Sequence, residues 1–145
     1  FESGRPVLML GSDTGMTAPA KRVLIAWDGS REAARAVQDS LPFLKAAEVV
    51  QIVVVDPDKL DDIDSALPGA QLAATLDRHG IRVSIDTIGS GIRSTAQVIE
   101  AHVKATNSDL LVMGAYGHPR LRDWLFGGVT RSVMNKVQAP TLLSR

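Results

Sequence analysis

The sequence contains no cysteine among its 145 residues. This absence excludes a disulfide framework, and it excludes thiolates as metal ligands or as nucleophiles. A chain without disulfides suits a reducing compartment, so we expect a cytoplasmic protein.

An excess of charge of one sign and a long apolar run are also missing. The chain has 16 basic and 16 acidic side chains and a formal net charge of zero, which argues against nucleic acid or an anionic membrane as a partner. No apolar run approaches the roughly 20 residues that span a bilayer, and the first residues lack the order of a secretory signal. These absences predict a soluble protein without nucleic-acid or membrane partners.

The first boundary in the chain is the stretch 11–20, whose Gly, Ser, Thr, Asp and Pro content is typical of a linker. We therefore expect a leader and linker at 1–20 and one domain at 21–145. The leader GRPVLML resembles QAPTLLS near the carboxyl end, since each has a proline before a short apolar run. This favours an extra strand, either the end of a preceding domain or an extension that pairs with a sheet edge; a disordered tail is the alternative. As a strand, Val7 to Leu10 would offer an edge for dimer pairing.

The main body alternates strand-like and helix-like segments. The apolar runs 22–27, 49–56 and 109–113 are typical of strands buried on both faces. Segment 81–88 alternates apolar and polar residues, which predicts an edge strand, and 140–144 provides a last strand.

Helical patterns fill the gaps between these strands. The expected markers of their ends are Ser30 as the first N-cap, Pro42 as the end or a kink of the first helix, Gly80 as a left-handed cap, and Ser94 with Gln97 as a capping box. Strand and helix in alternation predict an α/β fold, a doubly wound parallel sheet with right-handed crossovers and helices on both faces.

Two strand orders remain open from the pattern, a flavodoxin-like order and 3-2-1-4-5. Both place the first and fourth strands near the middle and create a crevice at their carboxyl ends. Asp28 ends the first strand and Gly114 ends the fourth, so we expect them to face each other across that crevice.

A glycine-rich segment follows the fourth strand. Gly114 and Gly117 fall in the loop that leaves the strand, and Gly127 and Gly128 fall at the first turn of a helix with an apolar stripe at Val129, Val133, Met134 and Val137. The free amides and partial positive charge of a helix N-terminus suit a phosphate. The alternative is that these glycines are only turn and cap residues.

The same residues resemble the universal stress protein (UspA-like) family. The pattern G-x2-G-x9-G falls on Gly114, Gly117 and Gly127, and the likeness extends to VLIAWDGSREAARA and VVVDP. The resemblance implies a Rossmann-like, five-stranded sheet of order 3-2-1-4-5 and a homodimer joined through the last strand. It also implies a stress-response or signalling role with ATP, or another adenine nucleotide with Mg, as ligand.

The resemblance further implies a set of binding residues. Asp28 and the backbone of Val54 would hold the adenosine end, and the glycine loop the phosphates. The full expected set is Ala26, Asp28, Val54, Gly114, Gly117, His118, Gly127, Gly128, Val129 and Thr130. Gly128 stands where the family has Ser or Thr, which removes a hydroxyl hydrogen bond to phosphate worth about 1.5 to 3 kcal/mol; Thr130 is the nearest hydroxyl that would compensate.

Catalysis is not expected. No second carboxylate, histidine or lysine is placed beside Asp28 by the sequence, and Ser30 lacks the G-x-S-x-G context of a hydrolase nucleophile. The acidic stretch 56–64 lacks the glycine turn and final glutamate of a calcium loop and is expected to be solvated. We therefore expect a nucleotide-binding protein; the alternatives are a dimeric interaction module without nucleotide and, third, a slow nucleotide hydrolase.

Overall fold

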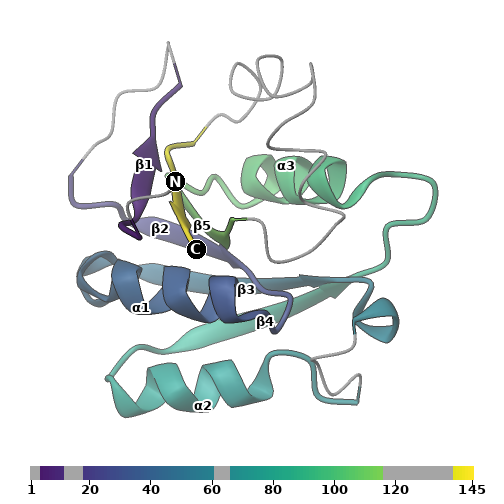
Figure 1. The fold of residues 1–145 in the computed structure, drawn as a ribbon, viewed down its shortest axis with the longest axis horizontal. Coiled ribbons are helices and arrows are strands. Elements are labelled where there is room, and N and C mark those ends of the chain that lie inside the picture. Colours follow the sequence, from purple (N-terminus) through teal and green to yellow (C-terminus); the bar gives the residue numbers. More distant parts are fainter. Residues whose placement is uncertain (1–3, 12–17, 61–65, 116–138) are drawn as a thin grey trace.

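The computed structural model describes residues 4–11, 18–60, 66–115 and 139–145. These residues form a six-stranded sheet in the order β1-β6-β5-β2-β3-β4 (Figure 1). The strands are β1 (Val7–Met9), β2 (Arg22–Ala26), β3 (Val49–Val55), β4 (Val83–Ile88), β5 (Leu110–Gly114) and β6 (Thr141–Ser144). The helices are α1 (Arg31–Ala46), α2 (Ala70–Arg78) and α3 (Thr95–Ala105), with a short 3-10 turn, η1, at Pro57–Lys59.

Five of the six strands run parallel, as the alternating pattern predicted. β2 pairs in parallel with β3 and with β5, β3 pairs with β4, and β5 pairs with β6. Counted along the main body, this is the order 3-2-1-4-5. The central places fall to β2 and β5, and the alternating strand β4 lies at an edge, as expected.

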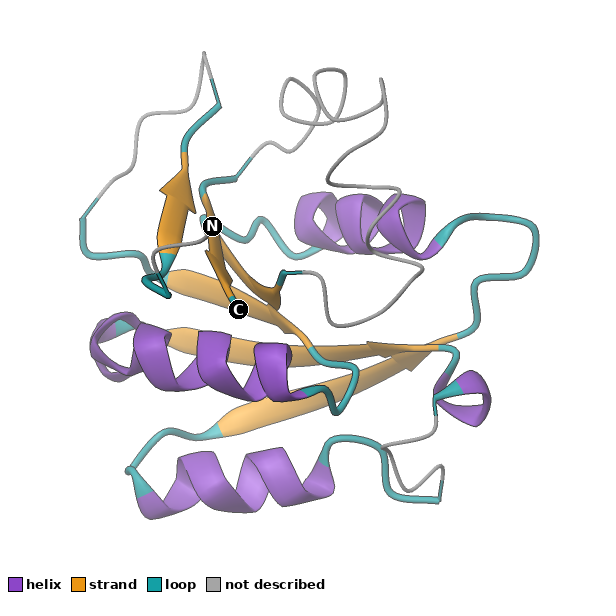
Figure 2. Ribbon diagram, in the orientation of Figure 1, coloured by secondary structure: helices purple, strands orange, loops and turns teal. Residues whose placement is uncertain are grey.

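The sheet separates two hydrophobic cores because neighbouring strand residues point to opposite faces. Leu24 contributes to a core with α3, whereas the next residue, Ile25, contributes to a core with α1 and α2. Both side chains are fully buried. Figure 2 shows the resulting layers, with α1 and α2 on one side of the sheet and α3 on the other.

The helix ends follow the sequence signals with one exception. Ser30 caps α1 through its side chain, Gly80 has a φ of 76° just after α2, and Ser94 and Gln97 form both halves of the capping box of α3. The expectation that Pro42 could end the first helix was wrong, because α1 continues to Ala46. Proline removes one intrahelical N–H but does not prevent the next turn when tertiary packing holds it.

The leader forms the expected extra strand. β1 runs antiparallel to β6, with Val7 opposite Leu143 and Met9 opposite Thr141. The outer edge of β6, through which the family resemblance implies a homodimer, is therefore covered by a strand of the same chain. The predicted helix around 129–137 lies outside the described residues. Within the described part of the chain, no helix has both the length and the apolarity to cross a membrane.

Candidate functional site at the carboxyl ends of the strands

The carboxyl ends of β2, β3 and β5 meet at one edge of the sheet because these three strands are parallel neighbours. Ala26, the last residue of β2, lies opposite both Val53 of β3 and Met113 of β5. Four of the predicted binding residues, Ala26, Asp28, Val54 and Gly114, are therefore brought to the same edge. In open α/β sheets, ligands bind at this edge.

Asp28 follows β2 and begins the connection to α1. Its Oδ1 atom accepts a hydrogen bond from the Ser30 N–H at 3.0 Å and another from the Ser30 hydroxyl at 2.6 Å. The carboxylate is half-buried, and its Oδ2 atom receives no hydrogen bond from the residues that the structure describes. Among the described residues, Asp28 is thus held in place through Oδ1 alone.

The N-terminus of α1 is capped by the Ser30 side chain. The Ser30 hydroxyl accepts from the Ala33 N–H at 3.1 Å while donating to Asp28. Asp28 adds a negative charge beside the positive end of the helix dipole. This confirms Ser30 as the N-cap of α1, as the sequence predicted.

Gly114 ends β5 directly against the first turn of α1. A Cβ atom placed on Gly114 would lie 2.5 Å from the Ala33 nitrogen and 2.7 Å from the Glu32 carbonyl carbon. Real side chains do not approach backbone atoms so closely, so the packing of β5 against α1 requires glycine at this position. The described contacts explain this glycine by helix packing, and its predicted role in binding stays a prediction.

The main-chain N–H and C=O groups of β3 face its two neighbouring strands, β2 and β4, in alternation. The Trp27 N–H donates to the Val53 carbonyl at 3.0 Å, and the Asp56 N–H donates to the Ile88 carbonyl at 2.9 Å. Because backbone directions alternate along a parallel strand, Val53 and Val55 face β2, whereas Val54 faces β4. Since β2 ends at Ala26, the main chain of Val55 points past the end of that strand. The predicted role of Val54 stays a prediction, and Val55 joins it as a candidate.

Asp56 is a second carboxylate at this edge, and the sequence reasoning counted it only among solvated acidic residues. Its side chain is 10% exposed. It accepts hydrogen bonds from the Ser90 hydroxyl at 2.5 Å, the Ser90 N–H at 2.8 Å and the Lys59 ammonium at 3.1 Å. The bonds from Ser90, hydroxyl first, together with the contribution of Lys59, lower the pKa of Asp56 to about 2 against the opposing effect of burial.

This Asp56 contact joins the loop after β3 to the loop after β4. Asp56 has a φ of 48°, a left-handed conformation that aspartate tolerates better than most residues. Ser90 is buried, so the pair is removed from water. The Asp-Pro dipeptide in VVVDP was the available signal for a turn here, but the partner 34 positions away was not visible from the sequence.

The rest of the predicted set lies outside the described residues. These positions are Gly117, His118, Gly127, Gly128, Val129 and Thr130. Among the residues that are described, no group of three or more His, Cys, Asp or Glu side chains is arranged to hold a metal ion. The described half of the site therefore consists of Asp28, the ends of β2 and β3, and the junction of Gly114 with α1.

The fold and this edge define a doubly wound α/β protein of the kind that binds ligands at the ends of its central strands. The model of the universal stress protein family matches residues 19–145. The chain belongs to the universal stress protein family, which confirms the resemblance drawn from the glycine pattern.

Individual relatives agree with this assignment. Universal stress protein Slr1230 of Synechocystis sp. (strain ATCC 27184 / PCC 6803 / Kazusa) is 27% identical over 128 residues, which cover 86% of this chain and 42% of the relative. The chain therefore spans less than half the length of this curated relative. A universal stress protein structure from Archaeoglobus fulgidus DSM 4304 matches with a TM-score of 0.73 at 21% identity, over 99% of this chain and 50% of that one.

A further structural relative carries a ligand. The structure of a universal stress protein in complex with cAMP matches with a TM-score of 0.58 at 16% identity, over 88% of this chain and 99% of that one. At such identities the two structural matches show a shared fold.

Proposed function

We propose that this protein binds an adenine nucleotide, with ATP as the first candidate, at the carboxyl ends of β2, β3 and β5. The observation that carries the proposal is that Asp28 and Gly114 lie at the same edge of the sheet. Gly114 is also the first glycine of the G-x2-G-x9-G pattern. The family relative in complex with cAMP supports an adenine nucleotide as the ligand class.

The described residues fit the adenosine end of such a ligand. The Asp28 Oδ2 atom accepts no hydrogen bond from the described part of the chain, and it would suit a ribose hydroxyl or a base amino group, both of which are hydrogen-bond donors. The main chain at Val54 and Val55 would meet the base, with Val55 supplying the groups that point past β2. The phosphates are assigned to Gly117, Gly127, Gly128 and Thr130 on the sequence pattern alone.

The proposed role is binding for stress response or signalling without turnover of the nucleotide. Asp28 is already committed to the cap of α1 through one oxygen, and a second carboxylate at this edge, Asp56, is engaged with Ser90 and Lys59. In both arrangements the carboxylate serves as an acceptor that fixes a loop, and no histidine, lysine or second carboxylate is hydrogen-bonded to Asp28 among the described residues. The protein is further proposed to act in the cytoplasm.

The direct test is native mass spectrometry of freshly purified protein, followed by calorimetric titration with ATP, ADP, AMP and cAMP in the presence of magnesium. Binding of at least one nucleotide is expected. Micromolar affinity requires about 8 kcal/mol, which several convergent amides of the predicted glycine loop and burial of the base would have to supply. If neither a mass shift nor heat is detected at saturating nucleotide, the binding proposal is wrong.

Variants locate the site. Asp28→Asn keeps an oxygen for Ser30 and removes the charge, so we expect weaker nucleotide binding with little loss of stability. Asp109→Asn is the matched control, because Asp109 binds the N–H groups of Lys21 and Arg22 at the opposite edge of the sheet. If the two substitutions lower nucleotide affinity equally, Asp28 is not part of the binding site.

Two glycine variants address the phosphate end. Gly117→Val should abolish binding while leaving the fold intact, and Gly128→Ser should tighten ATP binding by about tenfold or more if the missing hydroxyl matters. If Gly117→Val binds nucleotide with unchanged affinity, the glycines have only a structural role.

The contact of Gly114 with α1 favours a second candidate function. It explains one glycine of the pattern without any ligand, as expected for an interaction module that keeps the family fold and has lost the nucleotide. A folded protein that binds no nucleotide in the titrations would support this second function.

A further inference from the structure

Asp56 sets the direction of the chain at the end of β3. It has a φ of 48°, its N–H donates to the Ile88 carbonyl at 2.9 Å, and the chain then turns into η1 at Pro57. A non-glycine residue with such a φ is uncommon and depends on the contacts around it. Because Val55 is joined directly to Asp56, the contacts that hold Asp56 also fix the main chain of Val55.

Those contacts come from Ser90, in the loop after β4. Ser90 donates from its N–H to Asp56 Oδ1 at 2.8 Å and from its hydroxyl to Oδ2 at 2.5 Å. Ser90 is buried, whereas its neighbours Gly89 and Gly91 are exposed. Glycine on both sides gives this loop wide conformational freedom, so the loop depends on Asp56 as much as Asp56 depends on the loop. We call the two residues the Asp56–Ser90 clasp.

The clasp follows the part of β3 that extends past β2. The register of β2 with β3 ends at Ala26 and Val53, and in the described part of the chain the last hydrogen bond between these segments joins the Trp27 N–H to the Val53 carbonyl. Two residues further along β3, the N–H and C=O of Val55 point to the same side. They therefore project past β2, at the edge of the sheet that also carries Asp28.

Asp56 itself is not placed to bind a ligand. Both of its carboxylate oxygens accept from Ser90, and Oδ2 also accepts from the Lys59 ammonium at 3.1 Å. Asp28, by contrast, uses Oδ1 alone within the described chain. Asp56 would therefore act on a ligand through the main chain that it holds.

A main chain fixed in this way distinguishes purine bases by their edges. Adenine has an amino donor beside a ring-nitrogen acceptor, which a C=O and an N–H of one strand satisfy together. Guanine has a carbonyl acceptor beside an N–H donor, the reverse order. The wrong base leaves polar groups without partners, which is costly only while the main chain cannot move away.

We propose that the Asp56–Ser90 clasp sets the base specificity of the site by holding the main chain of Val55. The two residues are positioning residues and do not touch the nucleotide. With the clasp intact the site prefers adenine to guanine, and without it the two bases bind with more similar affinity. This inference rests on the proposed nucleotide binding and adds the residues that determine which base is accepted.

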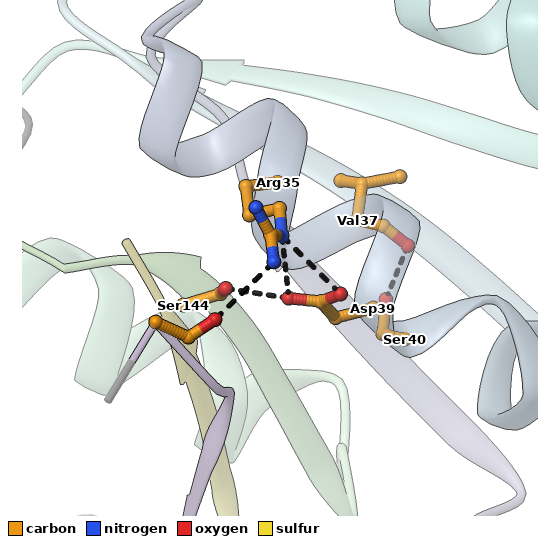
Figure 3. A network of polar contacts seen from close by, with 6 residues as sticks. Arg35, Val37, Asp39, Ser40 and Ser144 are labelled. Atoms are coloured by element: carbon orange, nitrogen blue, oxygen red, sulfur yellow. Dashed lines mark hydrogen bonds and ion pairs between the residues drawn. The ribbon is translucent and has the colours of Figure 1, made fainter. Parts of the chain in front are cut away.

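A second serine–aspartate pair provides a matched control (Figure 3). The buried Ser144 hydroxyl donates to Asp39 at 2.6 Å, and Asp39 also accepts from Arg35 Nε at 3.2 Å. The chemistry is that of the clasp, a serine hydroxyl and a basic side chain on one carboxylate. This pair joins β6 to α1, with β5 and β2 between β6 and β3. Ser144→Ala therefore removes the same kind of bond away from the end of β3.

The test measures the affinities of ATP and GTP by calorimetric titration, or those of cAMP and cGMP if cAMP binds more tightly. Each pair carries the same phosphates, so phosphate contacts cancel in the ratio. We expect Ser90→Ala to lower the preference for adenine about three- to tenfold, which fits the loss of one hydrogen bond. Ser144→Ala should leave the preference unchanged, and Ser90→Thr, which keeps the hydroxyl, should retain it.

A second measurement needs no ligand. The Asp56 amide is bonded to the Ile88 carbonyl, so its hydrogen exchange, followed by NMR, reports whether the end of β3 is held. Ser90→Ala should speed this exchange about threefold or more, and Ser144→Ala should not. Circular dichroism checks that each variant folds. If Ser90→Ala does not fold, Asp56→Asn takes its place, since the amide has one oxygen fewer to accept from Ser90.

The outcomes separate this inference from the proposed function. If the natural protein binds none of these nucleotides, the proposed function is wrong and base specificity falls with it. If the natural protein prefers adenine and folded Ser90→Ala keeps the same preference, the clasp does not set specificity although the binding proposal stands. The clasp is equally rejected if Ser90→Ala weakens both nucleotides by the same factor, or if Ser144→Ala changes the preference as much as Ser90→Ala does.

Discussion

At the scale of the residue, Gly114 has no side chain, and this allows β5 to pack closely against the first turn of α1. We expect Gly114→Ala to lower the free energy of unfolding by about 1 to 3 kcal/mol, because the added methyl would lie 2.5 Å from the Ala33 nitrogen and would push β5 and α1 apart. Urea denaturation monitored by circular dichroism measures the change.

Gly89→Ala is the control for this prediction. A Cβ at Gly89 meets no atom within 4 Å, and its backbone is not in the left-handed region. Its effect should stay within about 0.5 kcal/mol. Equal stability of the two variants would mean that the contact between Gly114 and α1 relaxes without cost.

Asp56 gives a prediction on pH. Its pKa is lowered to about 2 in the folded protein from 3.8, so its carboxylate stabilises the fold above about pH 4, and that contribution is lost as the pH falls toward 2. Asp56→Asn should therefore be less stable than the natural protein by about 1 to 2 kcal/mol at neutral pH. The difference should shrink between about pH 4 and pH 2.

Equilibrium unfolding in urea across this pH range provides the measurement. Asp58→Asn makes the same chemical change two residues away on an exposed side chain and controls for net charge. A difference between the natural protein and Asp56→Asn that is constant from pH 7 to pH 2 would show that the charge of Asp56 does not matter.

The residues also show where sequence reasoning stops. Asp28, Ser30 and Gly114 could be placed because each stands at the end of a strong apolar pattern or opens a helix. The contact of Gly114 with Ala33 and the bond between Asp56 and Ser90 could not, because each depends on how distant segments pack. Local sequence patterns carry no information on such distances.

At the scale of the element, helix ends were the most predictable features because caps depend on neighbouring residues. Ser94→Ala should destabilise the protein by about 1 kcal/mol, since the Ser94 hydroxyl accepts from the Gln97 N–H at the start of α3. Thermal unfolding measures this loss, and Ser84→Ala, on the exposed side of the edge strand β4, is the control.

Gln97→Ala completes this test. The Gln97 side chain accepts from the Ser94 N–H at 2.9 Å, so the two substitutions remove opposite halves of one capping box. We expect their effects to be coupled in a double-mutant cycle. Strict additivity would show that the two hydrogen bonds act separately.

Pro42 and β1 mark the limits of prediction for elements. Proline in a helical pattern usually signals an end, yet α1 continues to Ala46 because its buried residues, including Leu44, hold the last turn on the sheet. The leader could be predicted as a strand from its likeness to the last strand. Its antiparallel pairing with β6 depends on tertiary structure.

At the scale of the whole molecule, the fold class followed from the alternation of elements, but strand order did not. The pattern left two orders open, and the family resemblance selected the one that the structure has. Periodicity tells which residues are buried and says nothing about which strands are neighbours. The sheet also links the two hydrophobic cores, because Leu24 of β2 packs in one core and the adjacent Ile25 packs in the other.

This shared sheet predicts that the two cores unfold together. Leu24→Ala on the α3 side and Ile25→Ala on the α1 and α2 side should each cost about 2 to 5 kcal/mol. Each should also shift one common unfolding transition, because loss of either face removes support from β2. Urea unfolding by circular dichroism is compared with hydrogen exchange of peptides from α1 and from α3. If Leu24→Ala speeds exchange in α3 alone and leaves α1 as protected as in the natural protein, the sheet does not couple the two layers, and each face has a stability of its own.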